Sequence, residues 1–253
     1  MNQKTPINVY WAPLVINEID HSDWSFLYPK PDQLFSSLVK NKVSDSGNNN
    51  FFSCPATANK FKKTLVFNFP VDSHYTYDFS NNNKILQLEN PNGVAAQVLR
   101  DAAIKQGPCI YVNLSYVLFS DEPLDAFFTS PYFHKPGYTN YGTVVPGEFN
   151  IGKWFRPFNL ELQMWSNKGE FTIEENEPTF YVEFKTDRPI ELKRFSMNEK
   201  LFNYANSCVE TTNMFGRGRS LLQRYAMFDK VGLREKVLTE INKNIIEEPA
   251  FIL

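Results

Sequence analysis

The chain has 253 residues, of which 42% are hydrophobic and 21% are charged. This composition is typical of a globular protein and excludes disorder over most of the length. The formal net charge is −2, with 26 Lys and Arg against 28 Asp and Glu. Binding to duplex nucleic acid depends on an excess of basic side chains, so this balance argues against such a partner. The three cysteines and three histidines are too few for a disulfide scaffold or a standard zinc module.

The beginning of the chain carries no pattern of a targeting segment. Residues 1–6 are mostly polar and precede no long apolar run, so we predict that the protein is not secreted through a signal peptide. No segment approaches the roughly 20 apolar residues that a membrane span needs, so we predict no membrane partner. The widely spaced cysteines are expected to stay reduced in a cytosol.

The first third of the chain predicts short strands with one helix among them. Residues 7–11 and 64–69 are rich in β-branched and aromatic side chains, which favours strands. Residues 74–79 and 84–88 predict a hairpin around a short polar loop. Asp32 is expected to cap a short helix that follows it.

The middle of the chain predicts a helix, a strand and a loop in that order. Residues 94–106 space their apolar side chains as a helix does. Residues 110–119 predict the strongest strand of the first half. Residues 120–148 are rich in proline and glycine, which predicts a long ordered loop, and such loops are often functional.

The second half predicts four strands and then helices. Four segments alternate with a period of two: 160–164, 171–174, 179–184 and 190–193. Joined by short turns, they predict an antiparallel meander with one buried face. From residue 198 the apolar spacing changes to that of a helix, with Leu201, Ala205 and Cys208 on one face.

Together these patterns predict a mainly β protein with C-terminal helices. The predicted α+β fold has an antiparallel β-sandwich or jelly-roll-like core. We predict one domain over residues 1–253, with a β-rich core over 1–197 and a helical segment over 198–247 packed on it. The apolar tail 249–253 is expected either to fold back on the sheet or, with the helices, to contact a protein partner or a second copy.

Four segments resemble small proteins encoded by tailed phages of marine bacteria, including T4-like cyanophages. These segments are residues 54–56, 66–72, 154–158 and 177–195. The resemblance implies a phage origin, and with it a location in the host cytoplasm or the virion. It implies no activity, so the function has to be argued from the residues themselves.

One set of residues raises the hypothesis of an iron site. Oxygenases of the non-haem, 2-oxoglutarate type hold iron on a jelly-roll through two histidines and one carboxylate. Here His74, His134 and either Asp72 or Asp78 would supply that set. The usual His-x-Asp spacing is absent, since Thr76 stands in the required place. A half-exposed strand histidine is therefore the favoured interpretation of His74, and no cofactor is expected unless this alternative holds.

A second set of residues raises the hypothesis of a binding surface. Trp154 and Arg156 would offer an aromatic face beside a guanidinium, which suits stacking against a sugar or a base. Under the iron-site hypothesis, Arg156 or Arg188 could also pair with an acidic cosubstrate. The favoured interpretation is that these aromatic side chains fill the core at the start of a strand.

Two further motifs predict no chemistry on their own. Cys54 precedes Pro55, and a packed structural thiol is favoured over a nucleophile because no basic signature surrounds it. Residues 216–219 alternate glycine and arginine but lack the surroundings of a phosphate-binding loop, so we predict a joint between helices.

No complete catalytic constellation stands in the sequence. We therefore predict a non-enzymatic phage-encoded protein, either a virion component or a host-interaction binding module, that uses its sheets as a scaffold. An iron-dependent oxygenase on a jelly-roll and a carbohydrate-binding module around Trp154 and Arg156 are the alternatives.

Overall fold

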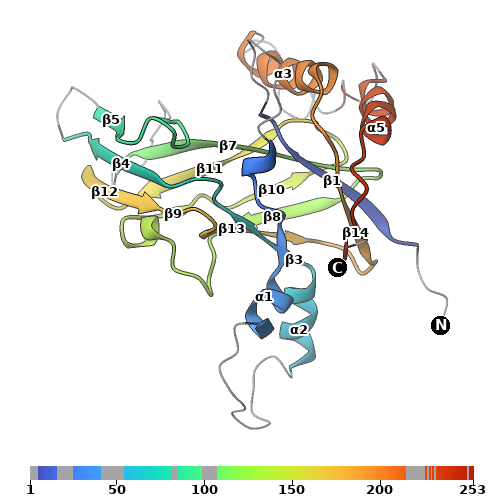
Figure 1. Ribbon diagram of the computed structural model, residues 1–253, viewed down its shortest axis with the longest axis horizontal. Coiled ribbons are helices and arrows are strands. Elements are labelled where there is room, and N and C mark those ends of the chain that lie inside the picture. The colour runs from blue at the N-terminus through green and yellow to red at the C-terminus, as the bar shows by residue number, and fades with distance from the viewer. Residues whose placement is uncertain are drawn as a thin grey trace.

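The computed structural model describes residues 5–15, 25–40, 54–80, 85–98, 107–214, 226, 228, 230, 232–249 and 251–253. Most of its regular structure is strand (Figure 1). The strands are β1 (Ile7–Pro13), β2 (Asp32–Gln33), β3 (Thr64–Asn68), β4 (Ser73–Asp78), β5 (Ile85–Leu88), β6 (Ala96–Val98), β7 (Cys109–Ser120), β8 (Asp125–Thr129), β9 (Gly142–Val144), β10 (Gly147–Asn150), β11 (Pro157–Met164), β12 (Lys168–Ile173), β13 (Pro178–Phe184), β14 (Ile190–Arg194) and β15 (Phe251–Ile252). The helices are α1 (Leu34–Lys40), α2 (Pro55–Lys62), α3 (Glu199–Met214) and α5 (Leu233–Lys243), with 3-10 turns η1 (Ser25–Leu27) and η3 (Gly137–Asn140). The motif at residues 216–219 lies outside the described residues.

Three sheets contain these strands. The largest has seven strands in the order β15-β14-β1-β7-β11-β9, with β6 paired to β7 beside this path. The second has the order β10-β8-β13-β3-β2, and the third has the order β12-β4-β5. Among the strands that the structure describes, β1 and β14 form the one parallel pair. The long strand β7 joins the halves of the large sheet, because it pairs with β1, β6 and β11.

The seven-stranded sheet packs its inner face against the other two sheets. In β7 the side chains of Ile110, Val112 and Leu114 enter the shared core, while Tyr111 and Asn113 point to the outside. That core also receives alternate side chains of β3, β4, β8, β11, β12 and β13. Removing these apolar surfaces from water stabilises the layered arrangement. The predicted mainly β fold, with an antiparallel sandwich and C-terminal helices, is confirmed.

Helices cover the outer faces of the two larger sheets. α3 and α5 lie on the outer face of the seven-stranded sheet, and α1 and α2 lie on the opposite side of the molecule, against the five-stranded sheet (Figure 1). Leu201, Ala205 and Cys208 of α3 are buried with Phe119 of β7 in one cluster. The predicted apolar face of this helix is therefore confirmed.

The predicted meander of the second half is wrong. Of its four strands, β11 and β14 belong to the seven-stranded sheet, β12 to the three-stranded sheet and β13 to the five-stranded sheet. A period of two determines which face of a strand is buried, but it does not determine which strand is the neighbour. The four strands were located correctly and paired wrongly.

Two predictions for the middle of the chain are also wrong. Residues 96–98 form β6, which pairs with β7, where we predicted the start of a helix. Residues 120–148 contain β8, η3, β9 and the start of β10, where we predicted a loop. Their prolines and glycines lie mainly between short strands, which is where such residues are tolerated.

The C-terminal tail folds back on its own sheet, one of the two arrangements that we predicted. Phe251 pairs with Leu192 and Ile252 pairs with Glu191 on the edge of β14. The backbone N–H of Leu253 also donates to the carbonyl of Ile190 at 2.9 Å. A protein partner for the C-terminal helices stays a prediction.

A buried carboxylate joins the two C-terminal helices and makes stability depend on pH. Glu240 of α5 accepts hydrogen bonds from Lys200 Nζ at 2.8 Å and from Asn198 Nδ2 at 3.1 Å. The bond from Lys200, followed by that from Asn198, lowers the pKa of Glu240 from 4.5 to about 2. A depressed pKa stabilises the fold above pH 4.5, and this contribution is lost as the pH falls toward 2.

We therefore expect Glu240→Gln to lower the melting temperature at neutral pH and to flatten its decline in acid. Thermal unfolding followed by circular dichroism between pH 7 and pH 2 would measure both effects. Glu235→Gln is the matched control, because Glu235 lies on the same helix and is exposed. A Glu240→Gln profile parallel to that of the wild type would contradict the assignment.

Candidate binding cleft

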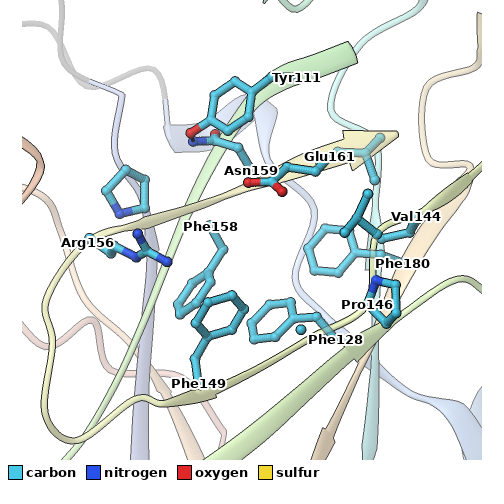
Figure 2. Close-up of a pocket in the computed structure, with 14 residues that line it drawn as sticks. Tyr111, Phe128, Val144, Pro146, Phe149, Arg156, Phe158, Asn159, Glu161 and Phe180 are labelled. Carbon is cyan, nitrogen blue, oxygen red and sulfur yellow. Dashed lines mark hydrogen bonds between the residues drawn. The ribbon is translucent and has the colours of Figure 1, made fainter. Parts of the chain in front are cut away.

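A small cleft opens at one end of the sandwich, where β11 of the large sheet faces β8, β10 and β13 of the second sheet (Figure 2). Its volume is about 100 Å³. The residues that line it come from these strands, from β7, from the end of β9 and the β9–β10 connection, and from the residue before β11: Tyr111, Phe128, Val144, Val145, Pro146, Gly147, Phe149, Arg156, Pro157, Phe158, Asn159, Leu160, Glu161 and Phe180.

Four phenylalanine rings form the floor of the cleft. The rings of Phe128 and Phe158 are stacked, with centroids 4.5 Å apart, and Phe149 meets each of them edge to face at 5.4 Å. Phe180 stacks on the other side of Phe128 at 6.0 Å. These mutual contacts fix the ring positions, so the floor is a preformed apolar surface.

Two charged side chains, Arg156 and Glu161, stand at the rim of this floor (Figure 2). The Arg156 guanidinium lies over the ring of Phe149, 5.2 Å from its centroid. Among the residues that the structure describes, neither the guanidinium of Arg156 nor the carboxylate of Glu161 has a hydrogen bond or an ion pair within 4.0 Å. Burial raises the pKa of Glu161, and Arg156 opposes that rise. The two charged groups therefore interact electrostatically without direct contact. Both can still form hydrogen bonds or ion pairs with another molecule.

The other polar groups of the rim are already bonded to the protein. Asn159 Oδ1 accepts the backbone N–H of Ser115 at 2.6 Å, and Asn159 Nδ2 donates to the hydroxyl of Tyr111. Ser115 has a positive φ of 56° at an irregularity of β7, so the asparagine holds an uncommon backbone conformation. Because Tyr111 accepts this bond, its own hydroxyl proton remains available to a ligand.

The local sequence explains why charge and aromatic rings meet here. Glu161 pairs with Tyr111 across β11 and β7, so both side chains are on the outer face of the large sheet. β9 pairs only with residues 162–164 of β11. The backbone N–H of Val145 then donates to the carbonyl of Glu161 at 2.8 Å, after which the chain leaves the sheet at Pro146. The remainder of β11 beside this exit borders the cleft.

The three residues predicted to form a binding surface lie in three different surroundings. Arg156 lines the cleft. Trp154 is buried under the C-terminal helices and contacts Phe228, with ring centroids 5.9 Å apart, so the favoured interpretation as a core side chain is confirmed and the hypothesis of a stacking face is wrong. Arg188 bonds to Glu122 at 2.7 Å and donates to the carbonyl of Thr5 at 2.9 Å, which ties chain segments together.

The residues predicted to bind iron are not assembled into a site. His74 bonds through Nδ1 to Thr172 at 2.6 Å and lies 3.5 Å from a carboxylate oxygen of Glu89. His134 bonds to the hydroxyl of Tyr181 on the five-stranded sheet, and burial lowers its pKa. Asp72 accepts the backbone N–H of Glu175 at 2.7 Å.

Within the described residues, no group of three or more His, Cys, Asp or Glu side chains is placed to hold a metal ion. The iron-site prediction therefore lacks its ligand set there, because the three proposed residues each bond to a different partner.

Cys54 differs from its prediction as well. It is exposed and stands immediately before α2, where hydrogen bonds from the backbone of Thr57 and Ala56 lower the pKa of its thiol. The favoured interpretation as a packed thiol is therefore wrong.

No protein-family model, curated protein or solved structure matches the chain. None of the helices in the described part of the chain is both long enough and apolar enough to cross a membrane.

Sequence reasoning missed most of the cleft. Glu161 occupies an outward position of an alternating strand, which usually indicates a solvent-facing side chain. Phe128, Phe149 and Phe180 belong to three different strands, so no local pattern connects them. Only the pairing of β8 with both β10 and β13 brings them together.

Proposed function

We propose that the protein is a non-catalytic binding module whose ligand site is the cleft beside β11. The observation that carries this proposal is the combination of a preformed phenylalanine floor with two charged side chains that no described residue pairs. An apolar pocket with a few converging polar groups is the usual construction of a small-molecule site. Leaving a half-buried carboxylate and a guanidinium unpaired is unfavourable in the free protein, and a ligand that pairs them removes this penalty.

The chemistry in and around the cleft favours binding over reaction. The thiol of Cys109, close enough to Glu161 to be affected by its charge, has its pKa raised to about 11, mainly by burial. It is therefore a neutral thiol at neutral pH and a weak nucleophile. At the rim of the cleft, the side chains of Asn159 and Tyr111 are hydrogen-bonded to each other. These features support orientation of a ligand.

The predicted phage origin suggests two settings for such a module, a virion component or a host-interaction protein. Peptides of a virion component are expected in mass spectra of purified particles. Their persistent absence would favour the second setting.

Filling the mouth of the cleft is expected to abolish binding. Val145 lines the cleft and is 38% exposed, so Val145→Trp places a large ring at the opening without disturbing the core. In a ligand-detected NMR screen of monocyclic aromatic compounds, we expect this variant to bind at least about tenfold more weakly than the wild type.

Val39→Trp is the matched control for this experiment. Val39 is 43% exposed on α1, which packs on the outer face of the five-stranded sheet. It should bind as the wild type does. If no compound of the screen binds, or if Val145→Trp binds as well as the wild type, the proposed function is refuted.

A further inference from the structure

The charges of the cleft specify more than an apolar ligand. Resting on the proposed function, we propose that the ligand is a small zwitterion of the α-amino acid class with a single-ring or branched apolar side chain. Its ammonium group would bind Glu161, its carboxylate would bind Arg156, and its side chain would lie on the phenylalanine floor.

The first step is the pairing of opposite charges. Arg156 and Glu161 interact electrostatically, since burial raises the pKa of the carboxyl and the guanidinium opposes this rise, but no ion pair within 4.0 Å joins them among the described residues. A ligand with only a carboxylate would gain from Arg156 and be repelled by Glu161. A ligand with only an ammonium group would meet the reverse situation. A zwitterion gains from both side chains at once.

The second step is geometry. Both charged groups lie at one side of the ring cluster in Figure 2, with the carboxylate of Glu161 above Phe158 and the guanidinium of Arg156 beside it. The α-carbon of an amino acid carries its ammonium and carboxylate groups a short distance apart and directs its side chain away from them. The cleft likewise presents two opposite charges beside an apolar floor.

The third step is size. A cavity of about 100 Å³ accommodates one ring or a branched aliphatic group, and is small for a fused ring system. Phe128 and Phe158 are each only 7% exposed and contact Phe149, so the ligand would lie mainly against the half-buried ring of Phe149 and not between the rings.

The guanidinium of Arg156 is suited to this role. It lies over the ring of Phe149, 5.2 Å from the centroid, and its N–H groups can form two parallel bonds to a carboxylate. The hydroxyl proton of Tyr111, whose oxygen already accepts a bond from Asn159, provides a further donor at the same rim.

Four probes separate the contributions in isothermal titration of the full chain: L-phenylalanine, 3-phenylpropionate, phenethylamine and L-alanine. L-phenylalanine carries both charges and the ring, and 3-phenylpropionate carries the carboxylate and the ring. Phenethylamine carries the ammonium group and the ring, and L-alanine carries both charges without a ring. We expect L-phenylalanine to bind most tightly, with each omission weakening binding about tenfold or more.

Two variants test the assignment of each charge to its residue. Glu161→Gln should weaken L-phenylalanine and phenethylamine about tenfold and should leave 3-phenylpropionate unchanged or tighter. Arg156→Gln should weaken L-phenylalanine and 3-phenylpropionate, and Arg156→Lys should restore part of the loss. Glu170→Gln, on the exposed side of β12, is the control that should bind every probe as the wild type does.

The outcomes distinguish this inference from the proposed function. If the three ring-bearing probes bind alike and Glu161→Gln changes none of them, the zwitterion assignment is overturned while the apolar binding site stands. If none of the four probes binds, the assignment is also overturned, and the wider screen with Val145→Trp then decides the proposed function separately.

Discussion

Tyr116→Ala is expected to lower the free energy of unfolding by roughly 3–5 kcal/mol, the cost of truncating a fully buried aromatic side chain. Tyr116 is 1% exposed and lies where the seven-stranded sheet faces the five-stranded sheet. Its ring meets those of Phe67 at 4.9 Å and Tyr28 at 5.1 Å, both edge to face. Its hydroxyl donates to the backbone carbonyl of Asn68 at 3.1 Å. Removing the ring opens a cavity between the layers and leaves that carbonyl without this bond. Urea denaturation at neutral pH would measure the loss.

Two controls separate the ring from its hydroxyl and from general effects of substitution. Tyr116→Phe removes only the hydroxyl, so it is expected to cost about 0.5–1.5 kcal/mol. Trp165→Ala removes an aromatic side chain that is 54% exposed, so it should change stability by less than about 0.5 kcal/mol. Equal losses of stability for Tyr116→Ala and Trp165→Ala would contradict the burial of Tyr116 between the two sheets.

Gly107→Ala is expected to give the second large loss of stability. Gly107 precedes β7 with a φ of +141°, a conformation that favours glycine. A Cβ atom there would lie 2.2 Å from the backbone carbonyl oxygen of Met164, at the end of β11. Because this neighbour is backbone, the strands would have to separate. We expect about 1–3 kcal/mol from the overpacking, and a further contribution of about 1–3 kcal/mol from the backbone strain.

Gly232→Ala is the matched control for this substitution. Gly232 also has a positive φ, of +63°, but nothing lies within 4 Å of its Cβ position. It should therefore show the conformational contribution without the contact. Thermal unfolding of both variants would test the comparison, and a Gly107→Ala variant no less stable than Gly232→Ala would refute the close approach of these strands.

Local patterns in the sequence predicted many elements of the fold but few of their partners. Residues 64–69 and 110–119 are strands because β-branched and aromatic side chains favour extended backbone, and that preference is visible in a short window. The parallel pairing of β1 with β14 joins residues about 180 positions apart, Ile7 with Ile190. The sequence of neither strand indicates that the other is its partner, because each strand has apolar side chains that would suit several neighbouring strands.

The residues of the binding cleft were harder to predict from local sequence patterns than the strands were. Arg156 was predicted as a binding residue, and the structure places it at the cleft. Trp154, two positions earlier, was predicted with it, but it is buried in the outer core. Glu161 was not predicted, because an outward charge on an alternating strand usually meets only water. Its place at a cleft with an apolar floor depends on β8 and β10 of the other sheet, which supply Phe128 and Phe149.

The location of a bound ligand would test most directly whether the cleft beside β11 is the binding site. The described residues border other hollows, one between α3 and α5 at Lys200 and Tyr204, and one beside Tyr28 and Val94. With selectively labelled protein and L-phenylalanine, we predict intermolecular NOEs from the ligand ring to Phe128, Phe149 and Phe158. NOEs that connect the ligand only to residues of either other hollow would contradict the assignment of the cleft as the binding site.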